Sequence, residues 1–328
     1  MIEGFNGLKA LVVGDVMIDV YSKGVVDRMS PEAPVPIVNL KSRFDRLGGA
    51  ANVALNLKAL GATPVVCSII GDDEAGKLLL RLMKEQSLEV AGLVSSNRRR
   101  TTVKHRVLDG LRQLLRIDEE DTFDLTGVEQ AILSHVVKQM IEQHDVDVVV
   151  LQDYNKGVLT EGLIHEVIHL CREQAIPVVV DPKKKNFLAY QGVTLFKPNA
   201  KELREGLGAK AETLEDLKQA MRTLQQRLNC EYLMVTLSEQ GVMMLHDGHF
   251  HHLPAHPRNV VDVSGAGDTV LSVAALCVAC RDASHTSPSA ATIASLSNIA
   301  GGIVCEEIGV VPIDKERFAK EVKLLCHE

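Results

Sequence analysis

The stretch VDVSGAGDTV, residues 261–270, decides the fold that the rest of the chain must adopt. Gly265, Ala266 and Gly267 are small and leave successive backbone amides exposed, and an apolar helix is expected to start at Asp268. A helix N-terminus has unpaired N–H donors and the positive end of the helix dipole, so it can stabilise a phosphoryl group that gains charge. On this stretch alone, Asp268 is either a helix cap or a general base that accepts the proton of an attacking hydroxyl.

The composition is that of an ordinary soluble globular protein. Its 328 residues include 36 basic and 43 acidic side chains, and 46% are hydrophobic. The net charge of −7 argues against nucleic acid as a partner, so an anionic ligand must be met by a local group of cations. Seven scattered cysteines, no signal peptide at the amino terminus and no apolar run approaching 18 residues predict a cytoplasmic protein that does not enter a membrane.

On either side of this stretch, short apolar strands alternate with amphipathic helices. The expected strands lie at residues 10–13, 65–70, 146–151, 177–180, 193–197 and 232–237. This alternation predicts one α/β domain over residues 1–328, with a parallel sheet covered on both faces and ligands at the carboxyl ends of the strands. The polar residues expected at those ends are Asp15, Asp153, Asp181, Asn199 and Thr236.

Two segments break the alternation and predict a small β-sheet lid, with strands at about 15–45 and 100–118. Residues 21–43 are irregular and contain three closely spaced prolines, as edge strands do. Residues 101–118 alternate on each side of Asp109-Gly110, which predicts a hairpin. Period-2 counting places Lys104 and Arg106 on one face, where they form either a phosphate clamp or a solvent-exposed edge guarded by charges.

Polar motifs follow several of the expected strands. Asn199 can cap a helix and Glu202 can complete a capping box, but an amide and a carboxylate here also suit magnesium beside ATP phosphates. Residues 236–241 form a small polar turn that can seat a nucleotide. Lys156 and the run 183–185 lie on the same side of the sheet and can neutralise phosphates.

Two further motifs point to ordinary structure. In HDGHFHHLPAH, residues 246–256, Asp247-Gly248 predicts a hairpin turn, and exposed strand histidines are a simpler interpretation than a metal site. Cys277 and Cys280 lie inside an apolar helix with no second pair at zinc spacing, so they are expected to pack in the core.

The motif Gly48-Gly49-Ala50-Ala51-Asn52, the pair Asn199-x-x-Glu202 and DVSGAGD occur in this order, and together they resemble the ribokinase family, also called the PfkB sugar kinases. The resemblance spans almost the whole chain. Within the family it looks most similar to the D-glycero-β-D-manno-heptose 7-phosphate kinases, through MSPEAPVPIV, LGGAANVALNLKALGA, QLLRID, QDYNKGVL and FKPNAKE. It implies a ribokinase-like, three-layer Rossmann-type α/β fold.

The resemblance also implies the reaction and the roles of individual residues. The γ-phosphoryl group of ATP would pass in line to a sugar hydroxyl, a reaction that depends mostly on positioning and charge stabilisation. Asp268 would be the general base, and the amides of Gly265, Ala266 and Gly267 the anion hole. The implied ligands are Asn199 and Glu202 for magnesium (Glu202 through water) and ATP phosphate; Thr236, Ser238, Gly241 and Asn298 for the nucleotide; and Asp15, Asp19, Gly48, Gly49 and Asn52 for the sugar. The charges of five further residues indicate a phosphate on the substrate without naming the sugar: Lys104, Arg106, Arg116, Lys156 and Lys185.

Two positions depart from the family pattern. Ser264 stands where many members have threonine, and Ser238 stands where many have glycine, which affects the expected nucleotide contact. Asp262 and the loop 305–309 resemble the family's monovalent-cation site, so potassium is an expected activator.

The expected activity is phosphorylation of the C1 hydroxyl of heptose 7-phosphate, giving the 1,7-bisphosphate for lipopolysaccharide synthesis. Many members fuse this domain to a nucleotidyltransferase, whose H-x-G-H motif lies beyond the kinase motifs. In residues 1–328 no such motif follows DVSGAGD, so only the first step is expected. A homodimer formed through the lid is also implied. The alternatives are a kinase for another phosphosugar, such as fructose or tagatose phosphate, and a sugar-phosphate sensor without turnover.

Overall fold

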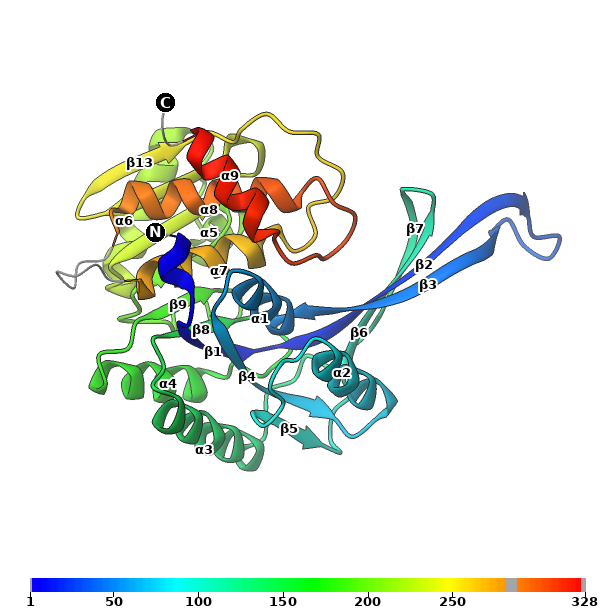
Figure 1. Cartoon of the computed structure of the whole chain (residues 1–328), viewed down its shortest axis with the longest axis horizontal. Coiled ribbons are helices and arrows are strands. Elements are labelled where there is room, and N and C mark those ends of the chain that lie inside the picture. Colours follow the sequence, from blue (N-terminus) through cyan, green and yellow to red (C-terminus); the bar gives the residue numbers. More distant parts are fainter. Residues whose placement is uncertain (1, 281–287, 326–328) are drawn as a thin grey trace.

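The computed structural model describes residues 2–280 and 288–325 of the chain. In these residues a nine-stranded sheet is covered by helices on both faces, and a four-stranded sheet projects from one side (Figure 1). This confirms the predicted α/β fold with a β lid. None of the helices in these ranges is both long enough and apolar enough to cross a membrane.

The strands of the main sheet have the order β13-β12-β11-β10-β9-β8-β1-β4-β5. In chain order they are β1 (Lys9–Gly14), β4 (Thr63–Gly71), β5 (Leu93–Ser96), β8 (Val148–Gln152), β9 (Val178–Asp181), β10 (Leu195–Phe196), β11 (Tyr232–Thr236), β12 (Val242–His246) and β13 (His249–Leu253). The strands from β5 to β11 are parallel, but β12 and β13 are antiparallel additions at one edge. The antiparallel pairing of β12 with β11 departs from the expected parallel sheet, because the turn at residues 237–241 lets the chain double back without a crossover helix. The pairing of β12 with β13 through the turn at Asp247-Gly248 is the predicted hairpin.

The strand order reverses at β1, which pairs with β4 on one side and with β8 on the other. The connection that leaves β1 leads to β4 and the connection that leaves β8 leads to β9, in opposite directions, so a crevice forms between the carboxyl ends of these two strands. The backbone stays paired up to this point, since the N–H of Asp15 donates to Gln152 O at 3.1 Å. The crevice at β1 and β8 is therefore where a ligand is expected.

Helices bury both faces of the main sheet. They are α1 (Ala50–Ala59), α2 (Glu74–Glu85), α3 (Gly127–His144), α4 (Glu161–Glu173), α5 (Ala200–Leu207), α6 (Leu214–Leu228), α7 (Ala266–Ala279), α8 (Ala290–Val304) and α9 (Lys315–Leu325), with short 3₁₀ turns at Ile2–Phe5 and Ser238–Gln240. Alternate residues of β1 point to different cores: Val12 belongs to the core that includes α1, α7 and α8, and Val13 belongs to the core that includes α3, α4 and α6.

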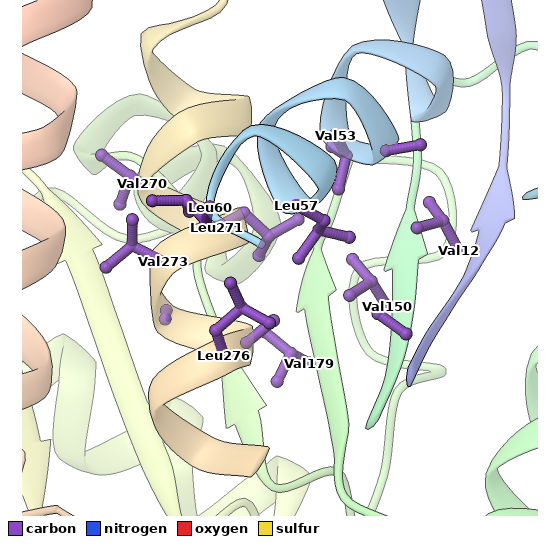
Figure 2. Packing of buried hydrophobic residues seen from close by; sticks show 14 of the residues in the cluster. Val12, Val53, Leu57, Leu60, Val150, Val179, Val270, Leu271, Val273 and Leu276 are labelled. Carbon is purple, nitrogen blue, oxygen red and sulfur yellow. The ribbon is translucent and has the colours of Figure 1, made fainter. Parts of the chain in front are cut away.

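Helix α7 lies against α1 and the central strands (Figure 2). Leu271 and Leu276 of α7 meet Leu57 of α1 and the strand residues Val150 and Val179 in one cluster. Nearly every residue from Asp268 to Val278 is buried, so this helix is apolar on all sides rather than amphipathic. Such packing fixes its N-terminus firmly at the crevice.

The lid is a four-stranded sheet with the order β3-β2-β6-β7. Its strands are β2 (Val16–Met29), β3 (Pro36–Gly49), β6 (Thr102–Asp109) and β7 (Arg112–Glu119). Strands β2 and β3 are long and well paired, where short irregular edge strands were expected for residues 21–43. The difference arises because the prolines lie in the turn between the strands and at the first residue of β3, where they interrupt no pairing.

Candidate active site

The loop before α7, residues 264–268, exposes backbone donors as predicted, and we call it the anion loop. Gly265 is the N-cap of α7 with φ 81°, a left-handed conformation that glycine adopts without strain. Within the described residues, no backbone acceptor pairs with the N–H groups of Gly265, Gly267 or Asp268. The amide of Ala266 instead donates to Val263 O at 3.3 Å. Three donors at the positive end of the helix therefore remain for an anion.

Asp268 lies in the first turn of α7 and is only 3% exposed. Its Oδ2 accepts a hydrogen bond from Asn52 Nδ2 at 2.7 Å. Its Oδ1 accepts hydrogen bonds from the Tyr154 hydroxyl at 2.8 Å and from Gln152 Nε2 at 3.2 Å. Burial raises the pKa of Asp268 to about 6, against the opposing effect of the bonds from Asn52 and Tyr154. The carboxylate is therefore largely ionised at neutral pH, with a pKa suited to a general base.

Gln152 and Tyr154 are functional candidates that the sequence analysis quoted within QDYNKGVL without assigning them a role. Gln152 ends β8, and its Oε1 is buried without a hydrogen-bond partner among the described residues. That oxygen can accept a hydrogen bond from a bound substrate. The signal in the sequence was their place just after a buried strand, at the edge where ligands bind.

Two lysines lie close to the anion loop: Lys197, which had no predicted role, and Lys183, which belongs to the run expected to neutralise phosphates. Lys197 Nζ is buried and forms an ion pair with Asp181 Oδ2 at 2.9 Å. A Cβ placed on Gly267 would lie 3.7 Å from Lys197 Nζ and 3.8 Å from Asp181 Oδ2, so this pair borders the anion loop. Lys183 bonds to Glu202 and approaches Asp181 Oδ1 at 3.8 Å. Both ammonium groups are placed to meet phosphate charge.

Asp15 holds a loop in place. Its Oδ2 accepts the N–H groups of Tyr154 at 2.7 Å and Lys156 at 3.1 Å, and its Oδ1 accepts that of Val158 at 3.2 Å. Burial raises the pKa of Asp15, and the three amides oppose this rise. The carboxylate thus anchors residues 154–158, and a sugar would have to use its remaining lone pairs.

The other predicted sugar ligands surround the root of the lid. Asp19 pairs with Arg106 Nη1 at 2.5 Å, and both side chains are buried or nearly so. A Cβ on Gly48 would lie 2.2 Å from Asp19 Oδ2, and one on Gly49, which has φ 60°, would lie 2.3 Å from Asp15 O. Only glycine allows this close approach. Asn52 is also here, but its side chain contacts Asp268.

The predicted phosphate ligands differ in whether a carboxylate already neutralises their charge. Arg106 is neutralised by Asp19, Lys156 pairs with Glu120 at 2.7 Å, and Lys185 pairs with Asp124 on the surface at 2.6 Å. The exposed Arg116 pairs with Asp118 of its own strand. No carboxylate of the described residues lies within 4.0 Å of Lys104 Nζ. Burial and the charge of Lys156 lower the pKa of Lys104.

A further cation, Arg99, was not singled out from the sequence. Its Nη2 donates to the carbonyls of Phe123 and Lys156 at 2.9 and 2.8 Å. Its Nη1 is buried without a partner in the part of the chain that the structure describes. Arg99 and Asp15 line a small polar pocket with Thr101. The loop that carries Lys156 is thus held from both sides.

The predicted nucleotide residues gather around the end of β11. Asn199 and Glu202 form the capping box of α5, with Asn199 N donating to Glu202 Oε2 at 2.8 Å. Asn199 also forms an isolated bridge with Thr236. Ser238 has φ 54°, a left-handed conformation that glycine adopts more readily than serine, which agrees with the glycine expected here from the family pattern.

Gly241 and Asn298 both contact the segment after β13. A Cβ on Gly241, which has φ 88°, would lie 2.0 Å from Leu253 O. Asn298 Nδ2 donates to Pro254 O at 2.9 Å. These contacts place the two residues on opposite sides of one loop, near the turn at Ser238.

Asp262 organises the loop behind the anion loop. Its Oδ1 accepts the N–H of Ser264 at 2.9 Å, and its Oδ2 accepts that of Gly309 at 2.8 Å. Burial acts to raise the pKa of Asp262, but these hydrogen bonds outweigh it and the pKa is lowered. Arg46 of β3 completes the arrangement by donating to Ile308 O and Val310 O, each at 2.8 Å.

The two motifs assigned to ordinary structure agree with the fold. Asp247 and Gly248 form the turn of the predicted hairpin, with φ values of 48° and 75°. Cys277 is fully buried in α7 and Cys280 partly so, which confirms the prediction of core packing.

Comparison with known proteins agrees with this geometry. Residues 8–315 match the profile described as pfkB family carbohydrate kinase. The chain belongs to this family. It is therefore a carbohydrate kinase, which transfers a phosphoryl group to a sugar. The predicted resemblance to the PfkB kinases is confirmed.

Two of the similar proteins illustrate the range of lengths and names among the relatives. The D-beta-D-heptose 7-phosphate kinase of Bordetella bronchiseptica is 41% identical over 313 residues, which cover 95% of this chain and 96% of that kinase. The bifunctional protein HldE of Syntrophotalea carbinolica is 40% identical over 312 residues, covering 95% of this chain and 62% of HldE. The chain thus spans less than two thirds of the length of the bifunctional relatives.

Solved structures share the fold at lower identity. The structure of phosphofructokinase-2 from Escherichia coli in complex with potassium superposes with a TM-score of 0.81 at 18% sequence identity. The match covers 98% of this chain and 99% of that one. Ribokinase from Arabidopsis thaliana, complexed with ribose and ATP, has a TM-score of 0.73 at 18% identity, covering 97% of this chain and 99% of that one. These likenesses support the ribokinase-like architecture.

Proposed function

We propose that this kinase phosphorylates the C1 hydroxyl of D-glycero-β-D-manno-heptose 7-phosphate to the 1,7-bisphosphate, for ADP-heptose and the inner core of lipopolysaccharide. The observation that carries the chemistry is the ionisable carboxylate of Asp268 beside the anion loop, at the switch point of the sheet. The likeness to the Bordetella bronchiseptica kinase supports the heptose. The free thiols of the described cysteines agree with a reducing compartment, and we propose the cytoplasm.

The geometry supports a direct in-line transfer. Asp268 Oδ2 accepts one hydrogen bond, from Asn52, so it has a lone pair for the sugar hydroxyl and takes its proton. The unpaired amides of the anion loop face the charge that develops on the phosphoryl group, and Lys197 stands beside them. All these groups are fixed before substrate binds, which lowers the cost of reorganisation.

We propose Glu202 and Asn199 for magnesium and the ATP phosphates. Magnesium prefers oxygen ligands and keeps several waters, so one carboxylate at this edge is sufficient. The donor set fits, but Glu202 Oε1 already accepts a bond from Lys183 and Oε2 closes the capping box. We therefore assign Glu202 to a contact through water. Bound magnesium would neutralise phosphate charge during transfer. Thr236, Ser238, Gly241 and Asn298 are proposed for the nucleotide.

For the sugar we propose Asp15, Asp19, Gly48, Gly49 and Asn52, all of which lie around the lid root. For its distant phosphate, Lys104 is the strongest of the proposed cations, because no carboxylate of the described residues is close enough to pair with it. Lys156 can join it by leaving Glu120, whose Oε2 is buried without a partner in the described chain. Arg106 and Lys185 would contribute less, since each already has its own carboxylate.

We propose Asp262 for a potassium ion that activates the enzyme. Its carboxylate has a lowered pKa and stays ionised next to the anion loop, where a cation would add charge. Each oxygen keeps a lone pair beyond its amide contact. Equal turnover in sodium and potassium at matched ionic strength would contradict this assignment.

We further propose a homodimer formed through the lid. The lid strands expose large apolar side chains, and a sheet with exposed apolar side chains and free edge strands is usually covered by another part of the protein or by a partner. The exposed members are Val25, Met29, Leu40, Leu115 and Ile117. Light scattering at micromolar concentration should give twice the chain mass, and a monomer would contradict the proposal.

The decisive experiment measures ADP release with magnesium ATP and three acceptors at equal concentration: heptose 7-phosphate, fructose 6-phosphate and ribose. A strong preference for heptose 7-phosphate supports the proposal. Turnover on fructose 6-phosphate alone would agree with a sugar kinase but contradict heptose 7-phosphate as its substrate. Asp268→Asn is the control, since it should remove sugar-dependent ADP release with every acceptor.

A further inference from the structure

We propose that Tyr154 positions the general base: its hydroxyl holds Asp268 Oδ1 and keeps the carboxylate in its proton-accepting form. The inference rests on the role proposed for Asp268. It adds a positioning residue that neither the motif nor the names of the relatives indicate.

The two oxygens of Asp268 have separate tasks. Oδ1 accepts both Tyr154 OH at 2.8 Å and Gln152 Nε2 at 3.2 Å, which fills its two lone pairs. Oδ2 accepts only Asn52 Nδ2 among the described residues, at 2.7 Å. Tyr154 therefore helps to direct the sugar hydroxyl to Oδ2, because it occupies the alternative oxygen.

Tyr154 remains a donor under all working conditions. Burial, followed by the charges of Asp268 and Asp181, raises its pKa well above the ordinary value. The phenol keeps its proton and cannot itself serve as the base. Two cations also face its ring, Lys183 at 5.5 Å and Lys104 at 5.9 Å from the ring centre. Their attraction to the ring holds the side chain in place.

The backbone of Tyr154 is fixed as firmly as its side chain. Its N–H donates to Asp15 Oδ2 at 2.7 Å, and the N–H of Lys156 donates to the same oxygen at 3.1 Å. Asn155 between them has φ 55°, and its N–H donates to Asp153 Oδ1 at 2.7 Å. A chain of contacts thus runs from the end of β1, through Tyr154, to the base.

Other charged groups face Asp268 and are unchanged when Tyr154 loses its hydroxyl. Asp181 raises the pKa of Asp268 and Lys197 lowers it, while burial has the largest effect. Lys183 also feels the charge of Asp268. Because the Tyr154 bond favours the ionised form, its loss should raise the pKa of Asp268.

The test compares Tyr154→Phe with Tyr190→Phe. Tyr190 is a matched control, because its buried hydroxyl donates to another buried carboxylate, Asp153 Oδ2, at 2.9 Å and does not contact Asp268. In Y154F the acid limb of kcat against pH should move up by about 0.5 to 1 pH unit, and kcat on the plateau should fall several-fold. The KM for ATP should change less than twofold, and Y190F should keep the wild-type limb.

A second measurement does not depend on turnover. Carbon-13 NMR of carboxyl-labelled aspartate, with Asp268→Asn to assign the resonance, follows the titration of Asp268 directly. An upward shift in Y154F but not in Y190F supports the proposal even if the sugar is not the heptose. An unmoved Asp268 titration in a folded Y154F protein would overturn it, as would equal shifts in both variants. Absence of turnover in the wild type with every acceptor would instead count against the proposed function.

Discussion

Asn52 donates a hydrogen bond of 2.7 Å to Asp268, although 216 residues separate them in the chain. One stands in the first turn of α1 and the other in the first turn of α7, so the bond joins the two glycine-containing motifs of the sequence. The packing of α1 on α7 brings these turns together (Figure 2). The proposed base is therefore positioned by the same contacts that build the core.

Asp268→Asn should lower kcat at least about 100-fold, because the proton of the acceptor hydroxyl loses its base. Folding should be preserved or improved near neutral pH. Since the folded pKa is about 6 and the ordinary value is 3.8, the ionised wild type loses stability between these values as pH rises. The advantage of D268N in thermal unfolding should thus shrink as pH falls from 7 towards 5. Turnover within tenfold of wild type would reject the general-base role.

Gly267→Ala should separate activity from stability. The new Cβ meets nothing closer than 3.7 Å, and alanine gains up to about 1 kcal/mol over glycine in a helix. The methyl group would nevertheless point between Lys197 and Asp181, into the space proposed for the transferred phosphoryl group. We expect kcat to fall more than about tenfold with an unchanged or higher Tm. Gly265→Ala is the contrasting variant, with a lower Tm, because φ is 81° there. Wild-type turnover by G267A would contradict the proposal that the phosphoryl group is transferred in the space beside Gly267.

Lys104→Met should raise KM for the phosphorylated sugar more than about tenfold while leaving KM for ATP within twofold. The reason is that Lys104 has no carboxylate to neutralise it among the described residues. Lys77→Met serves as the control, since Lys77 pairs with Glu74 on an exposed helix face. Steady-state kinetics with heptose 7-phosphate check both variants. Equal KM values for the sugar in K104M and wild type would show that cations other than Lys104 bind the phosphate of the sugar.

Arg46→Ala should lower the free energy of unfolding by about 1 to 3 kcal/mol, because two carbonyls lose a charged donor. It should also lower kcat, since Val310 packs near Gly265 in the anion loop. Arg46→Lys cannot reach both carbonyls in the same way and should recover only part of the loss. Arg43→Ala, at an exposed position of the same strand, should change stability by less than about 0.5 kcal/mol. Denaturant unfolding measures all three variants.

The layered fold and the position of the site could be predicted because they depend on local signals. Buried strands, helix starts and the tight turn at Asp247-Gly248 each appear as a short pattern of residue types. The anion loop and Asp268 were proposed from the same kind of signal. The antiparallel direction of β12 against β11 was missed because strand direction depends on pairing across the sheet, which a hydrophobic run does not encode.

The partners of the site residues could not be read from the sequence. Asp15 holds backbone amides, Asn52 holds Asp268, and Lys197 pairs with Asp181, each through contacts between distant segments. Residue type and spacing place a side chain at an edge of the sheet but do not say what it touches there. Tyr154 was missed for the same reason.

At the root of the lid, the start of β2, just after Asp15, pairs with the end of β3, just before α1. Val16 pairs with Gly49, Met17 pairs with Gly48, and Ala50 N donates to Asp15 O at 2.9 Å. The turn at residues 30–35 lies at the far end of the same hairpin (Figure 1). Insertions or deletions at that tip leave the root pairs in register, so selection can reshape the outer lid for a new neighbour without disturbing the chemistry at its base.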